Sequence, residues 1–182
     1  MKGEKKNISI RRFDDLGRIV IPREIRRLLQ YHDGDVVEIG TVGQSIVIDR
    51  CQPLSYMAPI CTQYLAAFAK NSNATCIICD TNNVVAARGI SIPTEPVLSA
   101  PVREHIKSLT IYEYSETDLL DLFGDGRYTV DVLYPVGKAV DMPMGAVLLL
   151  HYRPTTEKER NCARLLADIL TELTAATNKN IA

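Results

Sequence analysis

The chain has 182 residues, 46% of them hydrophobic and 24% charged, a balance that excludes an intrinsically disordered protein. Aromatic residues make up only 6% and the formal net charge is −1, so we expect neither a stacking platform for single-stranded nucleic acid nor an overall polycation. We find no signal peptide, no run of ~18 apolar residues and no disulfide framework among five irregularly spaced cysteines, so we expect a cytoplasmic protein with no membrane partner.

Positive charge is concentrated near the N-terminus. Residues 1–30 contain nine Lys and Arg against four Asp and Glu, a net charge of +5, whereas the rest of the chain carries −6. Pro53 is expected to interrupt regular structure, so we predict a boundary between a head, residues 1–52, and a body, residues 53–182. A basic head on an acidic body is the distribution expected when one module of a protein binds a polyanion.

The head is predicted to consist of short β elements and one short helix. In chain order these are a strand over 8–13, a turn over 14–17, a strand over 18–21, a helix over 23–29 for which Pro22 suits the first position, a turn over 33–35, and a hairpin of strands 36–42 and 45–49. A segment of about 50 residues with so few apolar side chains has a marginal core, so we predict that the head is stable only as an oligomer.

The body is predicted to consist of helices packed on a sheet. In chain order these elements are a helix over 57–68, strands over 75–79 and 84–87, a helix over 97–109, strands over 110–114, 128–136 and 145–152, and a long final helix that begins at a capping box of Thr156 and Glu159. This order predicts the α+β class, with a central antiparallel sheet and flanking helices. Apolar stripes over 57–68 and 162–173 either cover that sheet or pair with another chain, which would give a tetramer.

A specific motif lies in the head. Residues 14–27 read DDLGRIVIPREIRR, and Gly34, Asp35 and the first hairpin strand follow. This run resembles the signature of the AbrB-type swapped-hairpin transcription regulators, D-x-L-G-R-[VI]-V-I-P-x-E-[LI]-R-R, followed by a turn and a closing hairpin. In that family two heads interleave into one dimeric β-barrel that binds double-stranded DNA. Some members continue into a GAF-like domain, a fold that suits the element order of the body.

The resemblance also implies which residues bind DNA. They are the basic positions of the family pattern, which here are Arg11, Arg12, Arg18, Arg26 and Arg27. Arg23 occupies a variable position and is kept as an additional phosphate contact. The planar fork of a guanidinium group matches both phosphate and the edge of guanine. Because no long helix is available for the major groove, recognition is expected to depend on DNA shape, with a degenerate sequence preference.

The resemblance implies a nucleoid-associated transcription regulator of sporulation or another developmental programme. Its expected partners are double-stranded DNA, a second copy of the chain through the head, further copies through the C-terminal helices, and an unidentified small-molecule effector of the body. No cofactor is expected.

Nothing in the sequence favours an enzyme. Asp14 and Asp15 are expected to form a turn and orient arginines, because no nucleophile or base accompanies them. The three histidines are expected at the surfaces of their elements, and the chain has neither a phosphate-binding glycine-rich loop nor a nucleophile elbow.

Two alternatives remain open. The same head type occurs in antitoxins, although their toxin-binding tails are usually short and acidic. The second alternative is a thiol or metal redox sensor that acts through Cys76, Cys79 or Cys162. Residues three apart on a strand point to opposite faces, so we predict that Cys76 and Cys79 diverge into the core and form no metal site.

Overall fold

The computed structural model describes residues 9–92 and 97–179. The chain forms two units, Met1–Asp35 and Val36–Ala182. Their division lies upstream of the boundary at residue 52, which stays a prediction. None of the helices in the described ranges combines the length and apolar character that crossing a bilayer demands.

The first unit contains one helix, α1 (Arg23–Leu28), close to the predicted range. Pro22 does not occupy its first position, because a ψ of 144° makes it the capping residue before the helix. The strands predicted over 8–13 and 18–21 are not formed within the described residues, and Ile8 lies outside them. Strands are stabilised by a neighbouring strand, and a single copy of this segment supplies none.

The second unit begins with a hairpin, as predicted. Strands β1 (Val37–Val42) and β2 (Ser45–Arg50) pair antiparallel throughout. Gly43 has a φ of +60°, the left-handed conformation that a two-residue hairpin turn requires. Every residue of β1 is exposed. The sheets of the described residues are both open, so the closed barrel implied by the resemblance is not present in one chain.

Helix α2 (Pro53–Tyr56) follows β2 after residues 51 and 52, which have no regular structure, so the expected interruption lies just before Pro53. Pro53 itself begins the helix, because that position needs no N–H donor. Leu54 is fully buried, and the Ser55 hydroxyl donates a hydrogen bond to the Asp80 carboxylate at 2.7 Å. These contacts anchor α2 in the body.

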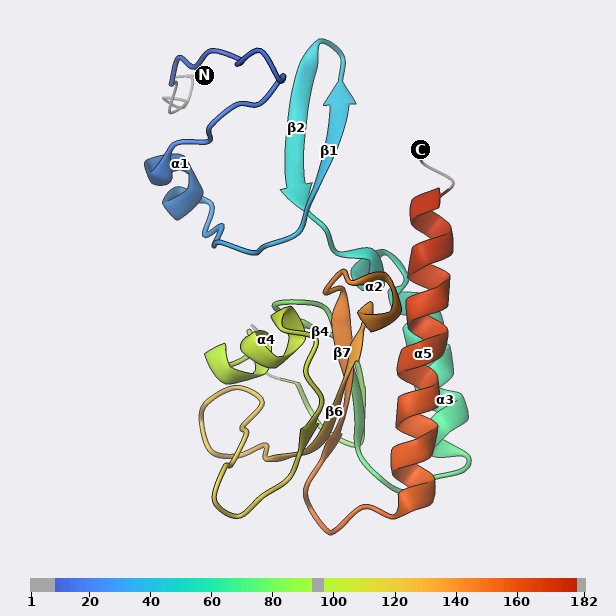
Figure 1. The fold of residues 1–182 in the computed structure, drawn as a ribbon. Helices are drawn as coiled ribbons and strands as arrows, with labels where there is room; N and C mark the ends of the chain where they lie inside the picture. Colours follow the sequence, from blue (N-terminus) through green and yellow to red (C-terminus); the bar gives the residue numbers. More distant parts are fainter. Residues whose placement is uncertain (1–8, 93–96, 180–182) are drawn as a thin grey trace, which may run out of the picture. The chain divides into compact units, whose positions relative to one another are not determined.

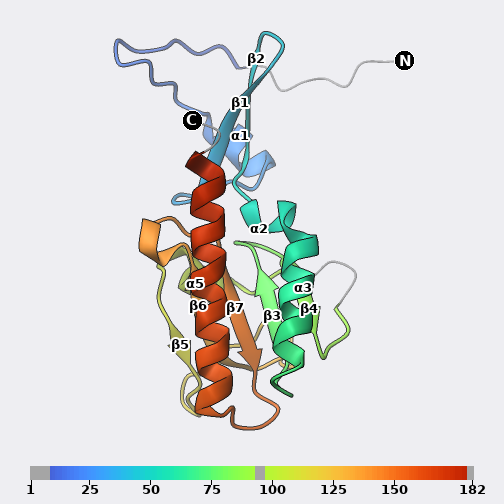
Figure 2. The same ribbon diagram turned by 90° about the vertical axis from the view of Figure 1, so that its right-hand side faces the viewer.

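The body is a five-stranded antiparallel sheet with helices on both faces (Figures 1 and 2). The strand order across the sheet is β4 (Val84–Arg88), β3 (Cys76–Cys79), β7 (Gly145–Leu150), β6 (Val130–Val136) and β5 (Tyr112–Glu113). The helices are α3 (Ala58–Ala69), α4 (Ala100–Lys107), α5 (Glu157–Lys179) and the short 3-10 helix η1 (Lys138–Val140). The predicted α+β class, antiparallel sheet and flanking helices are confirmed.

The core lies on both sides of this sheet. Strands β6 and β7 are buried along their whole length because helices cover both faces. Helices α3 and α5 pack on one face, where Leu65, Leu149 and Leu170 meet (Figure 2). Helix α4 packs on the other face, where Val102 contributes to a second cluster. The capping box of α5 is confirmed, since the Thr156 N–H donates to the Glu159 carboxylate at 2.9 Å.

Candidate nucleic-acid interface

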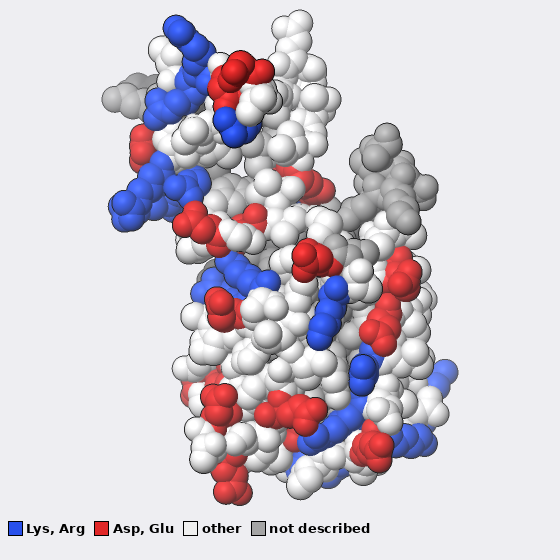
Figure 3. Space-filling model, in the orientation of Figure 1, with Lys and Arg blue, Asp and Glu red and all other residues white. Residues whose placement is uncertain are grey.

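The arginines singled out from the sequence all lie in the first unit, between residues 11 and 27. They are Arg11, Arg12, Arg18, Arg23, Arg26 and Arg27. Arg26 is half-buried and the others are exposed. Figure 3 shows Lys and Arg side chains gathered over α1 and the segment before it. The structure therefore leaves these cations accessible to a polyanion.

A tight turn fixes the position of Arg18. Gly17 has a φ of +73° and donates its N–H to the Asp14 carbonyl oxygen at 3.0 Å. One Asp14 carboxylate oxygen, Oδ1, accepts hydrogen bonds from the N–H groups of Leu16 and Arg18, at 3.0 and 2.8 Å. The other, Oδ2, accepts from Arg18 Nε at 2.7 Å. The hydrogen bonds from the backbone and then the side chain of Arg18 hold the pKa of Asp14 below its ordinary value.

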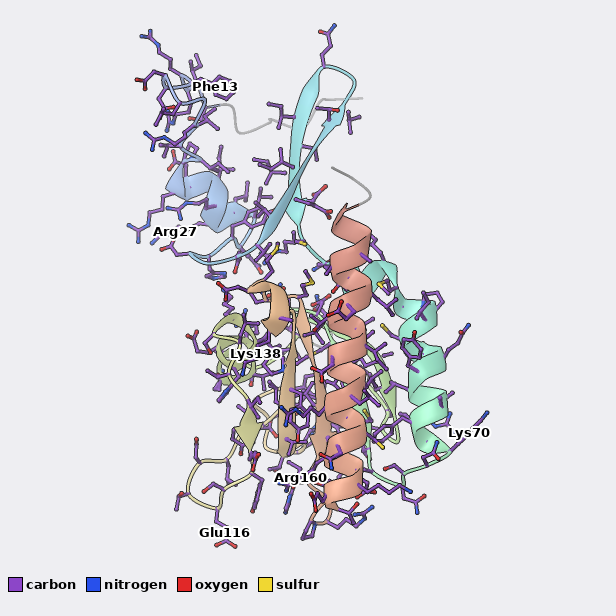
Figure 4. The ribbon with its side chains drawn as sticks, turned by 45° about the vertical axis from the view of Figure 1, so that its right-hand side comes forward. Phe13, Arg27, Lys70, Glu116, Lys138 and Arg160 are labelled. Atoms are coloured by element: carbon purple, nitrogen blue, oxygen red, sulfur yellow. The ribbon has the colours of Figure 1, made fainter. Side chains whose placement is uncertain are left out.

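Helix α1 carries the remaining arginines of the motif. It ends at residue 28 because Gln30 adopts the left-handed conformation, with a φ of +57°. The N–H groups of Gln30 and Tyr31 donate to the carbonyl oxygens of Arg27 and Arg26, at 3.1 and 2.8 Å, which is the Schellman pattern of a helix end. Cations in the last turn also favour the negative end of the helix dipole. Figure 4 shows the Arg27 side chain extending outward from α1.

The chain folds back after α1, so that a second carboxylate meets an arginine of the motif. Asp33 Oδ1 accepts a hydrogen bond from Arg26 Nη1 at 2.7 Å. The Asp33 side chain is 96% exposed, which makes this a surface ion pair of small net stability. No sequence pattern connects these two residues, since Asp33 lies in a turn beyond the end of α1.

The first unit leaves most of its apolar side chains uncovered. Within the described residues, the large hydrophobic side chains exposed there are Ile10, Phe13, Leu16, Ile19, Val20, Leu28 and Leu29. Helix α1 has no buried residue. The hairpin is similar, since Ile39 and Ile46 are 70% and 62% exposed. Large apolar side chains left exposed in this number favour an interaction site on each of the two segments.

The cysteine pair of β3 diverges as predicted. Cys76 belongs to the core on the α3 and α5 side of the sheet, and Cys79 belongs to the core on the α4 side. Burial raises the pKa of Cys76 to about 12, and it also raises that of Cys79. Within the described ranges, no group of His, Cys, Asp and Glu residues could hold a metal ion. Of the three cysteines considered for a redox sensor, only Cys162 is half-buried, whereas Cys76 and Cys79 are buried.

His151 follows β7 and is 24% exposed, and it takes part in a polar cluster around the buried Asp131 that the sequence did not predict. Asp131 sits at a β-bulge of β6, and its carboxylate is within 2.6 Å of His151 Nδ1. The hydroxyl of Thr155 and Nη2 of Arg160 also donate to Asp131, the latter at 3.2 Å. Figure 4 labels Arg160 on α5. The sequence signal that could have indicated this cluster is a lone carboxylate, Asp131, within an apolar strand. Its partners compensate for burying that carboxylate.

The apolar stripes of α3 and α5 are only partly covered by the sheet. Phe68 and Leu166 are buried, whereas Leu165 and Ile169 are 59% and 39% exposed. These side chains line a groove of ≈ 290 Å³ between the two helices. Part of each stripe therefore remains available to another molecule.

Comparison with known proteins gives one partial similarity. No protein-family model matches the chain. The chain is 35% identical over 83 residues to the stage V sporulation protein T of Bacillus subtilis strain 168, a stretch that covers 45% of this chain and 47% of that protein. The match thus spans about half the length of this curated relative. The similarity supports a relationship to that sporulation protein.

Proposed function

We propose that this chain is a transcription regulator that binds double-stranded DNA through a dimeric head, and that it is a binding protein and not an enzyme. The observation that carries the proposal is the coincidence, within residues 9–35, of accessible arginines and uncovered apolar side chains. The apolar side chains supply a reason for two copies to associate. The arginines supply a reason for the associated pair to bind a polyanion.

The dimer is supported by the energetics of the uncovered residues. Covering one side chain of the size of Leu or Ile contributes about 1.5–3 kcal/mol. Ile10, Leu16 and Val20 are 90%, 70% and 77% exposed in one chain, so their burial against a second copy would stabilise both. The unpaired residues 9–13 and 18–21 could then form strands, as the swapped-hairpin arrangement requires.

The DNA-binding mechanism follows from the charge of the head. Two copies would present each arginine of the motif twice, and each phosphate that they neutralise releases counterions. Helix α1 has six residues and is too short to read the major groove by itself. We therefore propose contacts mainly to phosphate, with a sequence preference set by the shape and deformability of the duplex.

The body is proposed to be a GAF-like domain that assembles chains and senses an unidentified effector. Its antiparallel sheet, with α3 and α5 on one face, suits such a fold. The groove between these helices exposes Leu165 and Ile169, which another body would cover. Pairing through both head and body would give a tetramer. The partial similarity to a sporulation protein supports a role of the proposed regulator in sporulation or a related developmental programme.

The proposal is tested by titrating labelled duplex DNA with the full chain at 50 to 200 mM salt, with light scattering on the same sample. We expect binding to weaken steeply with salt, about 10³-fold for six phosphate contacts. Arg18→Ala and Arg26→Ala should abolish binding while the oligomer stays intact. The matched control is Arg88→Ala, an exposed arginine of β4. Wild-type protein that ignores duplex at 50 mM salt, or equal binding by all these variants, would overturn the proposal.

The oligomer has its own test. Val20→Asp places a charge on a side chain that is already exposed in one chain, so it should leave the body folded. If Val20 is buried between two heads, the variant should have a lower mass by light scattering and lose DNA binding. An unchanged mass with unchanged DNA binding would contradict the interleaved head.

A further inference from the structure

Two carboxylates of the head accept hydrogen bonds from arginines of the motif, and they do so from different guanidinium nitrogens. Asp14 binds Arg18 at Nε, the nitrogen on the side of the guanidinium group. Asp33 binds Arg26 at Nη1, one of the two terminal nitrogens. The distinction matters because the terminal nitrogens form the fork that grips a phosphate or a guanine edge with two parallel hydrogen bonds.

The pair between Asp14 and Arg18 leaves the fork available. Asp14 Oδ2 takes the Nε–H, and no other described residue bonds the terminal nitrogens of Arg18. The Arg18 side chain is 72% exposed, so its fork faces solvent. Asp14 is itself held by the N–H groups of Leu16 and Arg18, which tie it to the turn. The carboxylate therefore fixes the guanidinium plane before any ligand arrives, which lowers the entropy cost of binding.

The pair between Asp33 and Arg26 has the opposite consequence. Asp33 takes one N–H of Nη1, so a phosphate that bonds both terminal nitrogens of Arg26 meets a carboxylate already bound to one of them. Asp33 is almost fully exposed, whereas Arg26 is only 39% exposed. The carboxylate lowers the positive charge at that end of the guanidinium group and repels a ligand of like charge.

We infer that these carboxylates act on DNA binding in opposite directions: Asp14 is a positioning residue that presents Arg18 to DNA, and Asp33 restrains Arg26. The inference rests on the proposed DNA-binding function. It gives two acidic residues within one basic surface distinct roles, although each lowers the local positive charge equally.

The test uses charge-matched asparagine variants of the full chain, with duplex affinity measured at several salt concentrations. In Asp14→Asn the side-chain oxygen can still accept the backbone N–H groups, but its NH₂ faces the Nε–H and cannot accept it. Asp33→Asn keeps a favoured Asn-Gly turn. The control is Asp15→Asn, in the same turn as Asp14, because no described residue bonds the exposed Asp15 side chain.

Charge alone predicts that all three variants bind DNA equally more tightly than the wild type. We expect instead that Asp14→Asn binds about tenfold more weakly than Asp15→Asn, the effect of immobilising one long side chain in each of two heads. Asp33→Asn should bind about two- to fivefold more tightly than Asp15→Asn. In an Arg18→Lys background, which keeps the positive charge but has no Nε–H for Asp14 to orient, Asp14→Asn should bind no more weakly than Asp15→Asn, which shows that Asp14 acts through Arg18.

The outcomes distinguish failure of the proposed DNA-binding function from failure of the roles assigned to Asp14 and Asp33. If the wild type does not bind duplex at 50 mM salt, the proposed function fails and this inference fails with it. If the wild type binds and the three asparagine variants are indistinguishable, the inference alone is overturned. If circular dichroism shows that Asp14→Asn unfolds the head, Arg18→Lys replaces it: loss of the Nε–H should weaken binding similarly, and wild-type affinity in that variant refutes the role of Asp14.

Discussion

Replacing Glu159 by glutamine removes the charge of a buried carboxylate whose two oxygens both accept hydrogen bonds. The Glu159 side chain is 7% exposed and binds the guanidinium group of Arg153 through both oxygens, at 2.6 and 3.0 Å. It also accepts hydrogen bonds from the Thr156 N–H at 2.9 Å and the Ser72 hydroxyl at 3.0 Å. Arg153 first, and then these partners, lower the pKa of Glu159 from 4.5 to about 2.

The magnitude follows from that pKa. A carboxylate whose pKa is lower in the folded state stabilises the fold at pH values above 4.5, and this contribution is lost as the pH falls toward 2. The difference corresponds to about 3 kcal/mol. Because Arg153 is 47% exposed, solvent screens part of the interaction, and we expect Glu159→Gln to lower the free energy of unfolding at pH 7 by about 2 kcal/mol.

The assay is urea unfolding of the wild type and Glu159→Gln at pH values from 7 to 2. The difference between them should be largest at pH 7 and shrink toward zero between pH 4.5 and 2. The control is Glu157→Gln, an exposed acid in the first turn of the same helix, which should lose only about 0.5 kcal/mol of helix-dipole interaction. A difference that stays constant with pH, or that equals the control, would refute the assigned cause.

Two further predictions concern the body. Gly137→Ala should lower the free energy of unfolding by more than about 3 kcal/mol, because φ is +103° and the added Cβ would overlap a backbone carbonyl oxygen of the same loop. Gly126→Ala, at φ +75° but in open space, should lower the free energy of unfolding by only about 1 kcal/mol. Thermal unfolding of both variants measures the two losses, and equal losses would contradict this explanation. At pH 8 an aromatic disulfide reagent should label Cys51 and Cys162 in the native protein and Cys76 only after denaturation; rapid native labelling of Cys76 would show that its burial is wrong.

Most of the body could be predicted from its sequence because its signals are local. The stripes of α3 and α5 repeat with helical spacing, and a capping box marks where α5 begins. The bulge at Asp131 could not be predicted, because it depends on how β6 and β7 pair. The partner of His151 follows from that pairing, which explains why the sequence placed this histidine without one.

In the head, prediction from the sequence fails for a different reason. Its turn at Gly17 and its hairpin have short sequence signals, and both are formed. The strands expected on either side of the turn find no neighbouring strand among the described residues, and strands do not form without one. The motif identified the arginines, but only the structure shows that the fork of Arg26 is occupied and that of Arg18 is open.

The anchored helix α2 limits how the chain can transmit a signal. Residues 51 and 52 separate its Pro53 from the end of β2, and a connection of that length reaches at most about 10 Å. A long flexible linker would let the body and the hairpin move independently. Here Leu54 and Ser55 are held inside the body, so any displacement of these residues is passed to the last residues of β2 through the two-residue connection.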